Sequence, residues 1–134
     1  MIQAFSENAN VPQNASYPLT NITIWKGDTT AVSGNTIQLN RCGVYKVEFN
    51  ASVTPETAGI VSAQMSRDGV LVPQAKAQVT GVVGNIANIS FVSLVQCDKN
   101  NTNCCCSLPV NISIINNSAG DVTGFAKIVV TKIC

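Results

Sequence analysis

The clearest pattern in the chain is a strict alternation of apolar and polar residues over residues 43–54. Side chains of a β-strand point alternately to the two faces of a sheet. One face of this segment is polar, and the other carries the apolar series Tyr45, Val47, Phe49, Ala51 and Val53. A period of two, rather than the helical period, predicts a strand with one buried face.

Similar segments recur along the chain, separated by Gly, Asn, Asp and Pro, and no segment has the apolar spacing of an amphipathic helix. The other expected strands are 1–6, 21–26, 36–39, 60–67, 70–79, 88–95, 110–115 and 125–133, and residues 8–20 are expected to form a loop. About eight to ten antiparallel strands without a helix predict an all-β sandwich or jelly roll. The length fits one domain over residues 1–134.

The dipeptide Asp68-Gly69 lies between two strand-like segments and is a strong signal for a β-hairpin. A type I′ turn needs a positive φ at both central residues, which Asp and Gly tolerate better than most residues. Pro73, early in the second arm, has no backbone N–H to donate to a sheet. This arm is therefore expected to be an edge strand or an interrupted strand.

Two later strands, 88–95 and 125–133, are apolar on both faces. Antiparallel sheets usually leave one face in water, so such a strand is either central in a covered sheet or packed against a partner. No helix is predicted to cover the sheet, which favours a partner subunit. The candidate interface residues in these strands are Phe91, Val92, Leu94, Phe125, Ile128 and Val130.

The composition narrows the classes of partner. Charged residues make up 11% of the chain, against about 25% in an average protein. So few charges cover a monomer poorly, which suggests that other chains bury part of the surface. The net charge of +1 leaves no basic patch for nucleic acid. No signal peptide and no apolar segment of ~20 residues is found, so synthesis in the cytoplasm and no membrane insertion are expected.

Catalysis and cofactor binding are not expected. The chain has no His, the commonest general base, and its acidic residues are scattered. Asp28, Asp68 and Asp121 occur in turns that contain Gly, where such side chains usually bond to the backbone. Lys46 and Glu48 are expected to form a surface pair that stabilises the fold little.

Two aromatic residues are candidates for contact with a sugar. Trp25 and Tyr17 are able to stack on a sugar ring, but a lone aromatic residue in a β protein more often packs in the core. Core packing is therefore the expected role of both.

Six cysteines remain as candidates for disulfides or interface thiols: Cys42, Cys97, Cys104, Cys105, Cys106 and Cys134. An even number permits several disulfide connectivities. A bond from Cys97 to one of the three adjacent cysteines would close the polar loop between them, leaving Cys42 and Cys134 for the others. Reduced thiols, buried or at an interface, are the alternative. A metal site is disfavoured because three adjacent cysteines fit one tetrahedral centre poorly and no His is present.

Four short motifs resemble TNF/C1q-like jelly rolls. The series Gly-x-Tyr-x-Val-x-Phe at residues 43–49 resembles their core strand, and the hairpin at 66–69 resembles their Arg-Asp/Asn-Gly turn. Residues 4–6 resemble the first strand of C1q-like heads, and residues 118–126 resemble their last turn and final strand. The likeness is greatest to small bacterial and phage versions, such as spore-surface glycoprotein C-terminal domains and phage virion proteins. It implies a tight homotrimer with the strands that are apolar on both faces near the threefold axis.

The resemblance implies a non-enzymatic structural protein of a phage virion. Such a protein would be a homotrimeric knob, without a collagen-like stalk, that decorates the capsid or tail and contacts other virion proteins and a host-surface glycan or receptor. The loops 96–108 and 119–124 are expected to form the contact surface at one end of the sandwich. The alternative is a secreted or cell-surface C1q/TNF-like module that binds a ligand or glycan, including one on a bacterial or spore surface.

Overall fold

The computed structural model describes residues 1–27, 30–97 and 110–133, apart from the side chain of Cys97. This part of the chain forms ten strands: β1 (Ile2–Val11), β2 (Asn21–Trp25), β3 (Thr30–Ser33), β4 (Thr36–Leu39), β5 (Gly43–Pro55), β6 (Gly59–Arg67), β7 (Val70–Gly81), β8 (Ala87–Cys97), β9 (Val110–Asn116) and β10 (Val122–Lys132). It contains no α-helix, and therefore no helix able to cross a membrane.

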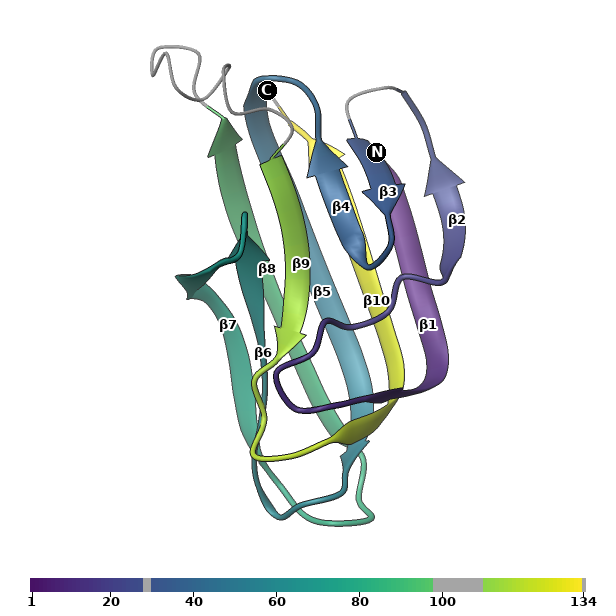
Figure 1. Cartoon of the computed structure of the whole chain (residues 1–134), viewed down its shortest axis with the longest axis vertical. Helices are drawn as coiled ribbons and strands as arrows, with labels where there is room; N and C mark the ends of the chain where they lie inside the picture. Colours follow the sequence, from purple (N-terminus) through teal and green to yellow (C-terminus); the bar gives the residue numbers. More distant parts are fainter. Residues whose placement is uncertain (28–29, 98–109, 134) are drawn as a thin grey trace.

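The strands form two antiparallel sheets of five strands each (Figure 1). Sheet A has the order β2-β1-β10-β5-β8, and sheet B has the order β3-β4-β9-β6-β7. The neighbours in each sheet are mostly remote in sequence, as in a jelly roll, where connections pass from one sheet to the other. The predicted all-β, antiparallel sandwich is confirmed.

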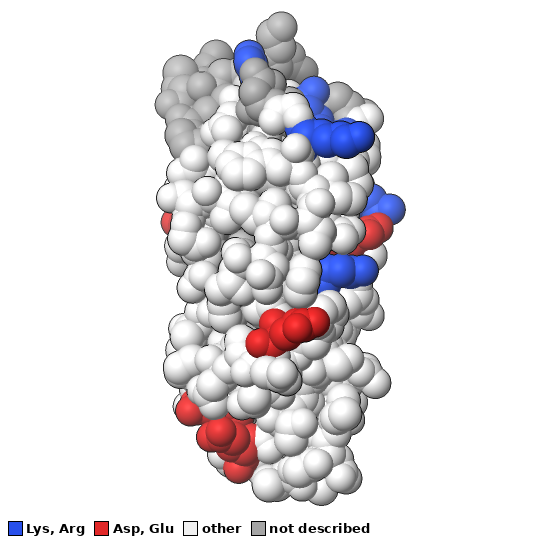
Figure 2. Space-filling view, turned by 90° about the vertical axis from the view of Figure 1, so that its right-hand side faces the viewer, with Lys and Arg blue, Asp and Glu red and all other residues white. Residues whose placement is uncertain are grey.

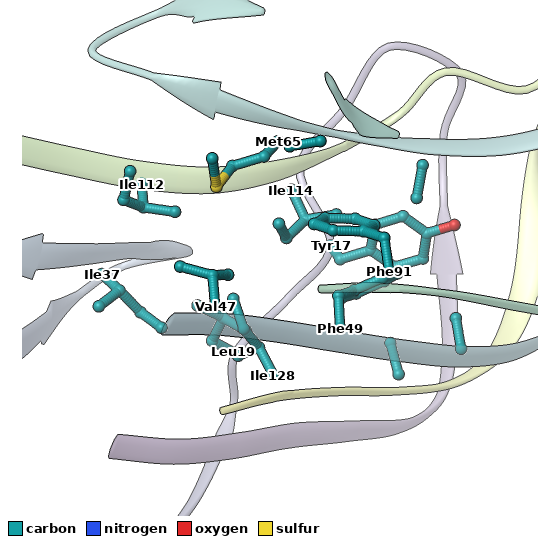
Figure 3. Close-up of a cluster of buried hydrophobic side chains, with 14 of the residues drawn as sticks. Tyr17, Leu19, Ile37, Val47, Phe49, Met65, Phe91, Ile112, Ile114 and Ile128 are labelled. Atoms are coloured by element: carbon teal, nitrogen blue, oxygen red, sulfur yellow. The ribbon is translucent and has the colours of Figure 1, made fainter. Parts of the chain in front are cut away.

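Strand β5 is paired along its length with both β10 and β8. Its apolar face points into the sandwich, where Tyr45, Val47 and Phe49 are completely or almost completely buried. Figure 3 shows this part of the core, in which side chains from both sheets meet between the layers. Ile37, Met65 and Ile112 come from sheet B, so the strand with the clearest alternation faces the opposite sheet as predicted.

The N-terminal region differs from the prediction. Strand β1 continues to Val11, past the expected end at residue 6, because a bulge with Asn8 at a φ of 50° lets it keep pairing with β10. The loop that follows is partly apolar and buried: Tyr17 and Leu19 belong to the core. Strand β3 was not predicted, since four residues that pair only with β4 give too short a pattern to recognise.

The predicted hairpin at Asp68-Gly69 is confirmed. Both residues have a positive φ, 51° and 86°, as a type I′ turn requires. The second arm, β7, is the edge strand of sheet B, and its pairing with β6 is interrupted between Gln64 and Ser66. The interruption lies opposite the segment that contains Pro73, in agreement with the expectation for this arm.

Residues 96 and 119–124 lie at opposite ends of the sandwich rather than at one end. Gly43 at the start of β5 is paired with Cys97, whereas Pro55 at the end of β5 is paired with Val122. The described residues of the two predicted loops therefore do not share one end of the sandwich, contrary to the expectation. Residues 98–108 of the first loop lie outside the described residues.

Candidate protein interaction surface

The outer face of sheet A carries large apolar side chains that no described residue of the chain covers. Strand β8 is the edge strand of this sheet and alternates between buried and exposed positions. Val92 is 62% exposed and Leu94 is 59% exposed, whereas Phe91 before them and Val95 after them point inward. An edge strand with an apolar outer face is unusual for a monomer, because such strands tend to be short or charged.

A second apolar group lies further along the same face, where Phe5 of β1 approaches Phe125 of β10. Their ring centroids are 5.9 Å apart with a tilted geometry, and Phe125 is 38% exposed. Val129 lies four residues further along β10, on the same face as Phe125, and is partly exposed. The apolar side chains therefore form two groups on this face, one on β8 and one on β10 and β1, separated by the polar outward side chains of β5.

Two of the charged groups on this face form an ion pair. Lys46 Nζ lies 2.8 Å from Glu48 Oε1, which confirms the predicted surface pair. In the sheet register Lys46 lies opposite Leu94, and Glu48 lies opposite Val92. A paired charge costs less to bury than a lone one. The ion pair therefore does not prevent this face from packing against another protein.

The face becomes polar and hollow toward the end of β5. Ser52 Oγ donates a hydrogen bond to Asn88 Oδ1 at 2.6 Å. A hollow of about 570 Å³ opens beside Phe125, and its lining includes Glu56, Ile86 and Gly124. The surface is therefore not flat, and a partner would need a projection that fills this hollow.

The structure divides the predicted interface residues into two groups. Val92, Leu94 and Phe125 point outward on the exposed face of sheet A. Phe91, Ile128 and Val130 point into the sandwich and are 9%, 1% and 0% exposed, so they belong to the core and are not available to a partner. The prediction counted both faces of the two-sided strands. The alternation separates the faces but does not by itself tell which one is covered within the chain.

The cysteines are only partly described. Cys42 is disulfide-bonded, so the expectation of disulfides holds at this position. Strand β8 ends at Cys97, whose side chain is not described. Cys104, Cys105, Cys106 and Cys134 lie outside the described residues, and their pairing stays a prediction.

The described residues hold no arrangement typical of a catalytic or metal centre. No three His, Cys, Asp or Glu side chains among them are close enough to hold a metal ion. Asp68 Oδ1 accepts a hydrogen bond from Asn111 N, and Asp121 Oδ1 accepts one from Gln13 N. Both carboxylates therefore bond to the backbone, as predicted, but of neighbouring segments rather than of their own turns.

Core packing is confirmed for Tyr17 and is wrong for Trp25, which lies on the surface at the edge of sheet A. Tyr17 is buried, and burial raises the pKa of its hydroxyl well above its ordinary value. Trp25 is 51% exposed, but its Nε1 donates a hydrogen bond to the carbonyl of Thr30 at 3.1 Å. This bond ties β2 of sheet A to β3 of sheet B across the open side of the sandwich.

Sequence reasoning missed one exposed apolar segment. The connection between β7 and β8 contains Val82, Val83 and Ile86, which are 59%, 54% and 71% exposed. The signal was the apolar run on both sides of Gly84-Asn85, which is unusual for a turn. Exposed apolar side chains in a connection are candidates for contact with another protein.

No protein-family model matches the sequence, and no curated protein matches it. Solved structures do. The globular domain of zebrafish complement 1qA matches with a TM-score of 0.71 at 10% identity, over 99% of this chain and 96% of that one. Eiger TNF from S. frugiperda matches with a TM-score of 0.69 at 12% identity, over 99% and 92%.

A third match is to a vertex protein. Vertex protein P5 of PRD1 has a TM-score of 0.64 at 15% identity, over 99% of this chain and 96% of that one. These identities are too low to carry a function from one protein to another, but the coverage is almost complete in each case. Together with the two-sheet topology, the three structural matches show that this chain has the TNF/C1q-like jelly-roll fold.

Proposed function

We propose that this protein is a non-enzymatic structural protein of a phage virion, a homotrimeric knob that decorates the capsid or tail. The observation that carries the proposal is the uncovered apolar face of sheet A, with Val92, Leu94 and Phe125 as its most exposed members. Burying one such side chain stabilises a complex by about 1.5–3 kcal/mol before the costs of association. Three copies that pack against one another through this face would bury it, and no second apolar face would become exposed.

The position of these residues supports a closed ring. Val92 and Leu94 lie on an edge strand, whereas Phe125 lies nearer the middle of the same sheet. The edge of one copy can therefore lie on the face of the next, which is a head-to-tail contact that closes into a ring when the rotation allows it. The resemblance to TNF/C1q-like proteins implies a ring of three.

The sparse charge also supports assembly. On the side of the molecule seen in Figure 2, the few charged groups are separated by wide uncharged areas. The chain as a whole has 8 basic and 7 acidic residues, so copies would not repel one another strongly.

A place in a virion is supported by the likeness to vertex protein P5 of PRD1. Synthesis in the host cytoplasm, contacts with other virion proteins and contact with a host-surface glycan or receptor belong to the same proposal. The likeness to zebrafish complement 1qA and Eiger TNF favours the alternative, a secreted or cell-surface module that binds a ligand or glycan, including one on a bacterial or spore surface.

Immunogold electron microscopy of phage particles from a host that carries this gene tests the proposal. We expect label at defined positions on the capsid or tail when the chain is wild type. A Leu94→Asp chain should be made but absent from the particles, whereas Val70→Asp, a control on the other sheet, should be incorporated. Label confined to the cell surface or medium would support the alternative and contradict the virion role.

A further inference from the structure

A polar pocket on the outer face of sheet B is a candidate site for the glycan contact that belongs to the proposed function, on which this inference rests. Its volume is about 420 Å³, within the usual range for small-molecule sites. The lining residues are Gln13, Asn14, Ile60, Ser62, Lys76, Gln78, Asn117, Ser118 and Ala119. This face lies on the opposite side of the sandwich from the exposed apolar face of sheet A. The pocket would therefore stay open in an assembly built on sheet A.

The inner part of the pocket is fixed by hydrogen bonds. The backbone N–H groups of Asn117 and Ala119 donate to the carbonyls of Ser62 and Ile60, at 3.0 and 2.9 Å, which lays residues 117–119 alongside β6. Ser118 Oγ accepts a hydrogen bond from Ser62 N at 2.9 Å and donates one to Ser62 O at 3.2 Å. A site held in this way loses little conformational freedom when a ligand binds.

A hydrogen bond from the loop after β1 closes the other wall. Gln13 Nε2 donates to the Ser118 carbonyl at 3.2 Å, and Asn14 N donates to the Asn116 carbonyl at 2.7 Å. Asn14 has a φ of 65°, a conformation that Asn tolerates better than most residues. The wall and the floor of the pocket thus come from segments that are far apart in the sequence. Gln13 and Ser118, which share a hydrogen bond, are separated by 105 residues.

The groups that face solvent at the rim have unused hydrogen-bonding capacity. The side chains of Asn14, Lys76 and Gln78 make no hydrogen bond or ion pair with any of the residues that the structure describes. At the floor, Ser62 is buried and supports the rim residues through its backbone bonds to Ser118.

These groups select a chemical class of ligand. Amide side chains both donate and accept, so they match a ligand rich in hydroxyl groups. Lys76 only donates and carries a positive charge, and no acidic residue lines the pocket to compete for it. Ile60, which is 49% exposed, and Ala119 offer an apolar surface to the C–H face of a ring. We infer that the pocket binds a sugar ring that bears a carboxylate, with Lys76 on the carboxylate and Gln78 and Asn14 on the hydroxyl groups.

Titration of the ¹⁵N-labelled protein with glucuronate, followed by NMR, tests this inference. Glucose is the matched ligand, since it has the same ring with a hydroxymethyl group in place of the carboxylate. We expect glucuronate to shift amide signals of residues 60–62, 76–78 and 117–119 in a saturable way. Glucose should shift the same signals and bind about fivefold more weakly, the size expected for one partly exposed charge contact.

Variants separate the charge from the hydroxyl contacts. Lys76→Met should remove the preference for glucuronate, and Gln78→Ala should weaken both sugars about threefold, as for one lost hydrogen bond. Lys26→Met, at an exposed lysine of sheet A, should change neither affinity. The spectra of the free variants show whether each one is folded.

Three results would overturn the inference. They are the absence of saturable shifts at the pocket, equal affinity for glucose and glucuronate in the wild type, and an equal loss of glucuronate binding in Lys26→Met and Lys76→Met. The last result would show that glucuronate binds to lysine charge in general. None of these outcomes bears on assembly through sheet A, which the molar mass of the same samples reports separately.

Discussion

Tyr17 shows how a single residue outside the strands completes the core. Its ring lies edge-on to that of Phe49, with centroids 5.1 Å apart, and its backbone N–H donates to the Ile114 carbonyl at 2.8 Å. Its hydroxyl is buried and has no hydrogen-bond partner among the described residues. The ring therefore supplies the stabilisation, and the hydroxyl opposes it.

Replacing Tyr17 tests this division of roles. Tyr17→Phe keeps the ring and removes the buried hydroxyl, so the free energy of unfolding should stay the same or rise by about 1 kcal/mol. Tyr17→Ala should lower it by about 3–5 kcal/mol because it leaves a cavity beside Phe49. Urea unfolding at neutral pH measures both. A loss of more than about 1 kcal/mol in Tyr17→Phe would show that the hydroxyl has a favourable contact.

The raised pKa of Tyr17 also predicts how stability depends on pH. The unfolded chain ionises this hydroxyl near pH 10, whereas burial keeps it protonated to a higher pH in the folded chain. The part of the free energy of unfolding that depends on a protonated Tyr17 is therefore complete below about pH 10. It is lost as the pH rises toward the pKa of the folded state. Between pH 9 and 11 the wild type should lose about 1 kcal/mol more than Tyr17→Phe. Parallel curves for the two proteins would contradict the raised pKa.

At the scale of the elements, the close pairing of β10 with β5 depends on one glycine. A Cβ at Gly124 would collide with the Ser52 carbonyl oxygen and would lie 2.9 Å from Val53 Cα. These are backbone atoms, which cannot move without disturbing the pairing of the two strands. The same position is paired with Ala9, just after the bulge in β1.

We therefore expect Gly124→Ala to lower the free energy of unfolding by about 3 kcal/mol. Gly34→Ala is the control, because Gly34 also has a positive φ but has open space around its Cβ position. Its cost should be only that of the backbone conformation, about 1 kcal/mol. Equal losses in the two variants, measured by chemical denaturation, would show that the collision with β5 is not important.

The hairpin between β6 and β7 is held by its turn residue as well as by its strands. Asp68 exchanges two hydrogen bonds with Asn111: its N–H donates to the Asn111 carbonyl at 2.8 Å, and its Oδ1 accepts from Asn111 N at 2.9 Å. Asp68→Asn keeps an acceptor and the tolerance for positive φ, so its effect should be below about 0.5 kcal/mol. Asp68→Ala loses both and should cost about 1–2 kcal/mol in thermal or urea unfolding. Similar losses in the two variants would contradict this role for the Asp68 carboxylate oxygen.

At the scale of the whole molecule, local patterns in the sequence predicted some features and not others. The alternation in β5 and the Asp-Gly turn depend on neighbouring residues, and the structure confirms both. The place of β8 at a sheet edge depends on its pairing with β5, in which partners such as Gly43 and Cys97 are more than 50 residues apart in the sequence. For this reason the sequence could not tell which face of β8 is covered.

The same limit applies to the pocket on sheet B. Its residues come from the loop after β1, from β6 and β7, and from the turn after β9, and none of these segments carries a recognisable motif. Ser62 and Ser118 look like ordinary polar residues in the sequence, yet both are buried. Their proximity follows from the strand order of sheet B rather than from any local pattern.

The molar mass of the purified protein, measured by light scattering with and without reductant, tests the central claim most directly. We predict three times the mass of one chain in both conditions for the wild type and for the control Val70→Asp. We predict the mass of one folded chain for Leu94→Asp, because a second carboxylate beside the Lys46–Glu48 pair would leave an excess negative charge to be buried on the outer face of sheet A. A monomeric wild type, or a trimer that persists in Leu94→Asp, would contradict assembly through this face.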